Sequence, residues 1–172
     1  MLSDGRQANK GVAYVPDSFV WHAGITRWTE MDLVRVSYYT SVVGDDEKVS
    51  EVVRKISATR FSCKASGKIG SASIIPRVSK RPRGTRKEKT VDIAITMDVI
   101  RTALILPIDG IYLLSGDADY LPLIEEITRS TAKQVYIGAF SSGLAAGLRT
   151  AGEHFIDLDA IFFERPTRPA VE

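Results

Sequence analysis

Residues 110–123 read G-I-Y-L-L-S-G-D-A-D-Y-L-P-L, and this stretch indicates how the chain folds. The apolar run at 111–115 predicts a short strand that ends at Gly116. A helix is predicted from about Asp119, because Pro122 is tolerated in the first turn of a helix. A buried strand that leads directly into a helix is the building unit of a parallel sheet.

The same alternation of strand and helix continues on both sides of this stretch. Residues 91–106 are ambiguous, since they begin with the alternation of a strand but stay apolar for longer than a strand does, and we expect a buried helix there. The whole pattern predicts an α/β fold with a mainly parallel sheet that helices cover on both faces. The other predicted strands are 12–15, 33–40, 60–64, 135–140 and 155–158, and the other predicted helices are 21–28, 45–56 and 142–150.

Length and composition limit the class of protein. The chain has 172 residues, 44% of them hydrophobic, and we expect one domain over residues 1–163 followed by a loose tail at 164–172. It has no apolar stretch of about 18 residues and no signal-peptide pattern at its start, so no membrane segment is expected. Its single cysteine, Cys63, forms no internal disulfide, which fits a cytoplasmic location.

Few residues are available for several other common kinds of site. Two histidines, His22 and His154, and one cysteine argue against a structural zinc site. A Ser-His-Asp or Cys-His hydrolase stays open, but it would depend on the same few bases.

Basic residues are concentrated in one segment. Between Lys64 and Lys89 lie nine lysines and arginines and one acid, while the rest of the chain holds 14 bases and 20 acids. Such a segment on an acidic body indicates a polyanionic partner, although a solvated loop is the plainer alternative. Residues 66–89 are also rich in Gly, Ser and Pro, which predicts a long exposed loop. The candidate nucleic-acid-binding residues are Lys80, Arg81, Arg83, Arg86, Lys87 and Lys89.

Two aspartates follow the predicted strand at 111–115. Asp117 would project from the carboxyl end of the strand, and Asp119 lies at the start of the next helix. In open α/β sheets, ligands bind at this edge. An aspartate at a helix start also serves as an N-cap, so a purely structural role for Asp119 stays open.

Asp92 and Asp98 lie in the otherwise apolar segment 91–106. A buried carboxylate needs a partner or a cation, because burial of a lone charge is costly. In a helix the two lie about 120° apart, so at most one points into a site shared with Asp117, and we favour Asp92. For Asp98, a hydrogen bond to neighbouring backbone or a supporting role stays open.

Several carboxylates that converge in one crevice repel each other. A hard divalent cation such as Mg²⁺ or Mn²⁺ removes that repulsion and prefers oxygen ligands. Next to a basic loop, a site of this kind predicts metal-assisted hydrolysis of a phosphodiester.

Four strings in the chain form a specific combination. They are Y-Y-T at 38–40, K-T-V-D at 89–92 with Asp98 six residues on, S-G-D-A-D-Y-L-P-L at 115–123, and F-I-D-L at 155–158. Over residues 32–158 the chain thereby resembles the NYN domain (LabA-like) family of the PIN-like nuclease superfamily. The resemblance implies a Rossmann-like three-layer sandwich, a divalent metal held by acidic residues, and endoribonuclease activity. By motif position it implies that Asp92, Asp117 and Asp119 are metal-site residues and that Asp98 is their neighbour.

The N-terminus departs from this resemblance. Family members usually begin with a hydrophobic strand that leads into Asp-Gly-x-Asn, whose aspartate completes the metal site. The nearest match is Asp4-Gly5-Arg6-Gln7, which makes Asp4 a further catalytic candidate, and residues 12–17 offer a rival match without the asparagine. We therefore expect an abbreviated first strand, a truncated start, or the loss of the first aspartate.

The leading hypothesis is a metal-dependent ribonuclease that acts on single-stranded RNA, with water as the nucleophile. One alternative is a catalytically weak or inactive nucleic-acid-binding or regulatory protein of the same fold. Another is a metal-dependent phosphatase for small phosphorylated molecules, which has less use for a basic loop. The sequence leaves the oligomeric state open, a homodimer included.

Overall fold

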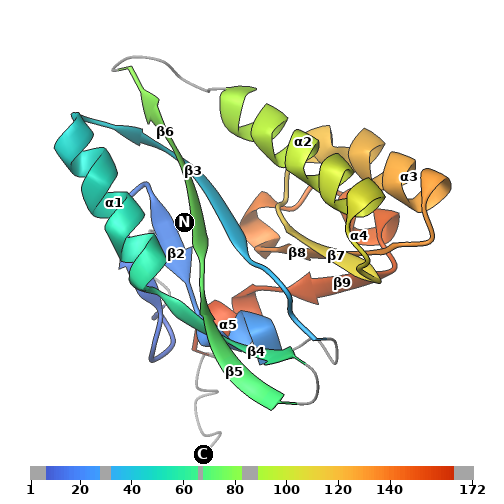
Figure 1. Ribbon diagram of the computed structural model, residues 1–172, viewed down its shortest axis with the longest axis horizontal. Coiled ribbons are helices and arrows are strands. Elements are labelled where there is room, and N and C mark those ends of the chain that lie inside the picture. The colour runs from blue at the N-terminus through green and yellow to red at the C-terminus, as the bar shows by residue number, and fades with distance from the viewer. Residues whose placement is uncertain (1–6, 28–31, 66–67, 83–88, 165–172) are drawn as a thin grey trace, which may run out of the picture. The chain divides into compact units, whose positions relative to one another are not determined.

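A computed structural model describes residues 7–27, 32–65, 68–82 and 89–164 (Figure 1). The contacts within the chain divide it into two units. The middle unit is Ala13–Val99, and the terminal unit combines Met1–Val12 with Ile100–Glu172. Helix α2 (Lys89–Ile105) runs from one unit into the other.

The middle unit contains one parallel strand pair and two antiparallel hairpins. In the parallel pair, β3 (Ser37–Val43) lies opposite β6 (Ile75–Arg81), and α1 (Asp46–Ala58) packs against both strands (Figure 1). Its elements are β1 (Ala13–Val15), β2 (Phe19–Trp21), the 3-10 helix η1 (Ala23–Arg27), β3 (Ser37–Val43), α1 (Asp46–Ala58), β4 (Arg60–Ala65), β5 (Lys68–Ser73) and β6 (Ile75–Arg81). The hairpins are β1–β2 and β4–β5.

The sequence of α1 shows why a helix forms there. Asp45 caps its first turn, because its Oδ1 accepts a hydrogen bond of 2.9 Å from the Lys48 backbone N–H. Acids in the first turn and Lys55 in the last turn complement the helix dipole. Val52 and Ile56 lie four residues apart on the inner face and are almost fully buried. Their burial anchors α1 on the unit's core.

The terminal unit is built on a parallel sheet of three strands, β7 (Gly110–Leu114), β8 (Gln134–Ala139) and β9 (His154–Asp157), in the order β7-β8-β9. Val135 and Ile137 of β8 are buried, and α3 packs against that strand with its own buried Ile124 and Ile127. The elements are β7 (Gly110–Leu114), the 3-10 helix η2 (Ala118–Tyr120), α3 (Leu121–Ser130), β8 (Gln134–Ala139), the 3-10 helix η3 (Ser141–Gly143), α4 (Leu148–Ala151), β9 (His154–Asp157) and α5 (Asp159–Phe162).

The structure confirms the predicted α/β class with mainly parallel pairing, and several predictions need correction. The helix predicted at 91–106 is present as α2, but Ala103 is its only buried residue among those that the structure describes, so it is not the buried helix we expected. The long basic loop at 66–89 is wrong, because β5 and β6 occupy most of its described part and α2 starts at Lys89. The helix predicted at 21–28 is replaced by the end of β2 and by η1. The helix predicted at 142–150 is reduced to η3 and the short α4, because glycines at 143 and 147 interrupt it.

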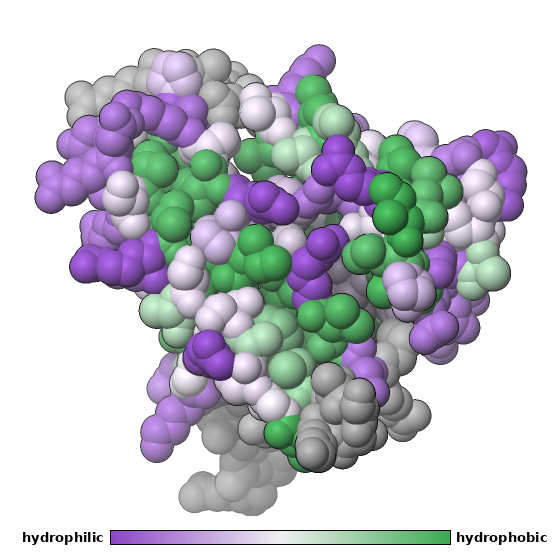
Figure 2. Space-filling model, viewed as in Figure 1, coloured by the Kyte–Doolittle hydropathy of each residue, from purple (hydrophilic) through white to green (hydrophobic). Residues whose placement is uncertain are grey.

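Apolar side chains reach the surface between charged ones on the face shown in Figure 2. On α2, Ile93, Met97 and Leu104 are each more than half exposed. Even so, within the described ranges no helix combines the length and apolar character needed to cross a bilayer. The predicted tail at 164–172 lies outside those ranges, apart from Glu164.

Candidate functional site

The turn after β7 holds two of the predicted site residues. The Asp117 backbone N–H donates to Ser115 Oγ at 3.2 Å, and the Asp119 N–H donates to Asp117 Oδ1 at 3.1 Å. Asp117 therefore caps the 3-10 helix η2 that leads into α3. Asp119 is exposed, and its carboxylate has no hydrogen bond or ion pair with the described residues. The turn thus presents carboxylate oxygens at the carboxyl edge of the sheet, as the sequence predicted.

Gly116 lets a second loop approach this turn. A Cβ atom at Gly116 would lie only 2.1 Å from the Gly143 carbonyl oxygen, closer than any side chain allows. The Ala145 N–H donates to the Gly116 carbonyl at 3.0 Å. The loop after β8 is therefore fixed against the turn after β7.

A second acidic turn follows β9 and was missed as a site element. Asp157 Oδ1 accepts from the Asp159 N–H at 2.9 Å, which repeats the bond of Asp117 with Asp119. The Ser141 hydroxyl, from the loop after β8, donates to the Asp159 carboxylate. The repeated Asp-x-Asp spacing after a strand was the signal in the sequence. The same edge of the sheet thus carries acids after β7 and β9.

The predicted metal ligands lie in different parts of the chain. Asp117 and Asp119 belong to the terminal unit, and Asp92 and Asp98 belong to the middle unit. Among the residues that the structure describes, no three His, Cys, Asp or Glu side chains are grouped closely enough to hold a metal ion. Asp4 lies outside the described ranges. A joint site formed by these residues therefore stays a prediction.

Helix α2 positions the other two aspartates. Asp92 lies in its first turn, as predicted, and is half-buried. Asp98 Oδ2 accepts a hydrogen bond of 2.5 Å from the Tyr39 hydroxyl, and Arg77 Nη2 lies 3.7 Å from the same oxygen. Tyr39 and Arg77 are opposite each other in the β3–β6 pair. Asp98 therefore joins α2 to both strands of that pair.

The environment of Tyr39 keeps its hydroxyl protonated. Burial, followed by the hydrogen bond and the negative charge of Asp98, raises the pKa of Tyr39 to about 12. The phenol is thus a neutral donor at any physiological pH. Two structural roles were left open for Asp98, a hydrogen bond to neighbouring backbone or a supporting role. The bond that forms runs to the Tyr39 side chain and not to neighbouring backbone.

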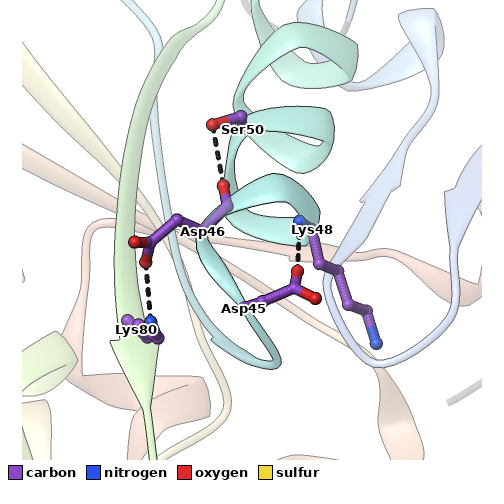
Figure 3. A network of polar contacts seen from close by, with 5 residues as sticks. All are labelled: Asp45, Asp46, Lys48, Ser50 and Lys80. Carbon is purple, nitrogen blue, oxygen red and sulfur yellow. Dashed lines mark hydrogen bonds and ion pairs between the residues drawn. The ribbon is translucent and has the colours of Figure 1, made fainter.

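The structure describes only three of the six predicted nucleic-acid-binding residues. Lys80 Nζ lies 2.6 Å from Asp46 Oδ1, and this contact lowers the pKa of Asp46 (Figure 3). Figure 3 also shows the Asp45 cap and the Ser50 hydroxyl, which donates to the Asp46 carbonyl at 2.8 Å. Arg81 is the last residue of β6 and Lys89 the first of α2. The remaining three, Arg83, Arg86 and Lys87, lie outside the described ranges.

The rival N-terminal match, residues 12–17, lies largely in a hairpin. Strand β1 pairs antiparallel with β2, and Asp17 occupies the intervening turn with a φ of 55°. The Ser18 N–H closes this turn by donating to the Val15 carbonyl at 3.1 Å. Within the described residues, Asp17 therefore does not follow a parallel strand as Asp117 and Asp119 do.

Comparison with known proteins supports both the fold and the family. Residues 13–159 match the NYN domain, a range that includes Asp92, Asp117 and Asp119 and excludes Asp4. A crystal structure of a protein of unknown function from Vibrio parahaemolyticus is similar, with a TM-score of 0.54 and 17% identity over 81% of this chain and 78% of that chain. At that identity the similarity concerns the fold alone. No curated protein matches the chain.

Proposed function

Because the chain belongs to the NYN domain family of the PIN-like superfamily, whose function is nuclease-like and related to RNA, we propose that it is a metal-dependent endoribonuclease. The substrate would be single-stranded RNA, and the reaction would be hydrolysis of a phosphodiester. The family match carries this proposal, since it spans Asp92, Asp117 and Asp119 in one continuous range. The whole matched range would then act as one catalytic domain.

The donor chemistry of the turn after β7 fits a hard divalent cation, as NYN nucleases generally require. Asp117 and Asp119 offer carboxylate oxygens two residues apart, and Asp119 is exposed. Mg²⁺ and Mn²⁺ prefer oxygen ligands and often take only one or two carboxylates. Asp92 would supply a further carboxylate. When bound, such a cation supplies Lewis-acid activation of water and neutralises charge on the phosphate.

Basic residues next to the acidic ones would hold the RNA backbone. Lys89 is exposed and lies three residues before Asp92, so both occupy the first turn of α2. This spacing places the Lys89 ammonium group, which can bind a phosphate, beside Asp92, a candidate metal ligand. Lysine contacts of this kind bind phosphates without selecting bases. We therefore expect weak sequence preference from this part of the site.

The test is cleavage of a labelled single-stranded RNA by the full chain with Mn²⁺, at saturating RNA. Asp117→Asn should abolish cleavage, while the matched change Asp109→Asn, at an aspartate before β7, should leave it intact. Equal cleavage by wild type and Asp117→Asn would refute the proposal. RNA binding without any metal-dependent cleavage would favour a regulatory NYN protein that only binds nucleic acid.

A further inference from the structure

Three rings stand in a row across the sheet of the terminal unit. Tyr112 of β7, Tyr136 of β8 and His154 of β9 are direct neighbours in the strand register. The ring centroids of Tyr112 and Tyr136 are 6.2 Å apart with planes at 17°. Those of Tyr136 and His154 are 5.0 Å apart with planes at 19°. In-register strands thus stack the three rings along the sheet.

The row ends in an exposed ring on β9. The Tyr112 hydroxyl oxygen is buried, and the Tyr112 ring lies over Gly138, where a Cβ atom would come within 3.5 Å of it. His154 is exposed and belongs to β9, the last strand in the order β7-β8-β9. Tyr136 is its one ring neighbour among the described residues. The second face of the imidazole therefore points beyond the sheet.

A cation–ring contact lies on the face of β9 opposite to His154, because successive strand residues point to opposite faces. The exposed Arg149 guanidinium sits 5.3 Å from the ring centroid of Phe155, the residue after His154. Glu153, the residue before His154, is also exposed and adds a negative charge. An exposed flat ring is a feature on which proteins stack the bases of single-stranded nucleic acid.

We propose that His154 is a stacking platform for one nucleobase of single-stranded RNA, which adds to the row as its fourth ring. The proposal rests on the RNA substrate proposed above and assigns it a contact outside the acidic turns. Stacking uses the π-face that every base has, so the platform tolerates any sequence. Tyr136 positions the imidazole and does not itself touch the base.

The experiment measures binding of a labelled single-stranded RNA to the full chain by fluorescence anisotropy, in EDTA so that no metal-dependent cleavage occurs. His154→Ala should weaken binding about five- to tenfold, the low end of the range for one stacked base. His154→Phe keeps a flat ring and should restore most of the affinity. His22→Ala, the same change at the other histidine, should have no effect.

A second ligand separates stacking from a structural role. A ribose-phosphate oligomer of equal length without bases should bind wild type and His154→Ala equally, because it has nothing to stack. The proposal would be overturned if wild type and His154→Ala bound normal RNA with equal affinity, or if His154→Ala lost affinity equally for both ligands. It would also be overturned if the surface at His154 bound only protein. Cleavage is measured separately. A chain that cleaves no RNA but still shows the His154 effect on binding would refute the proposed nuclease activity and leave the stacking role of His154 intact.

Discussion

The change Tyr39→Phe tests how Asp98 is used. It removes one hydroxyl and leaves Asp98 Oδ2 with Arg77 at 3.7 Å. A hydrogen bond to a charged acceptor contributes about 1.5–3 kcal/mol to stability. The Asp98 side chain is 24% exposed, so water replaces part of the lost bond. We expect the free energy of unfolding at pH 7 to fall by about 1–2 kcal/mol, measured by urea denaturation.

The pH dependence of the folding stability gives the same test an expected direction. The pKa of Tyr39 is about 12 in the folded protein and 10.0 in its ordinary state, so folding favours the neutral phenol. The resulting stabilisation is complete below pH 10 and is lost as the pH rises towards 12. The stability difference between wild type and Tyr39→Phe should shrink over that interval.

A matched control is available at Tyr14, which is 48% exposed. Tyr14→Phe removes the same hydroxyl and should leave stability unchanged at pH 7. If Tyr39→Phe behaves like Tyr14→Phe at every pH, the bond to Asp98 contributes nothing and Asp98 returns to the set of candidate metal ligands.

Three further outcomes are expected. Mn²⁺ should raise the melting temperature by binding the folded state, and the double change Asp92→Asn, Asp117→Asn should abolish that shift; an unaltered shift in calorimetry would exclude both residues from the site. Gly116→Ala should cost about 2–3 kcal/mol in urea denaturation, whereas Gly143→Ala, which meets no atom within 4 Å, should cost far less; similar losses would refute the close packing. Lys89→Ser should weaken RNA binding equally for all sequences and reduce the salt slope by about 1, and an unchanged slope would remove Lys89 from the phosphate contacts.

Local patterns in the sequence predicted the sheet of the terminal unit well. Strands β7, β8 and β9 are short apolar runs bounded by glycine or charge, so their periodicity is visible in the sequence alone. Strand β6 was missed for a physical reason. It contains Pro76, lysine and arginines, and its partner in the described pairing is β3 alone, so it has the charged and proline-containing sequence that edge strands tolerate.

The candidate site shows the same contrast between local and distant information. Asp117 and Asp119 could be placed because the strand, the glycine and the helix start are neighbours in sequence. The bond of Asp98 with Tyr39 could not, because 59 residues separate the two and only the tertiary fold brings them together. The turn at Asp157 was predictable in principle, since it repeats the spacing of Asp117 and Asp119.

The parallel pairing of β3 with β6 also bears on the order in which the middle unit folds. Ser37 and its partner Ile75 are far apart in sequence, and closing a loop of about 38 residues costs about 3 kcal/mol of chain entropy. The intervening α1 and the β4–β5 hairpin need only local contacts, so they can form first and shorten the effective loop. Destabilising α1 by Val52→Ala should then slow refolding in stopped-flow experiments, whereas faster unfolding at an unchanged refolding rate would place α1 late.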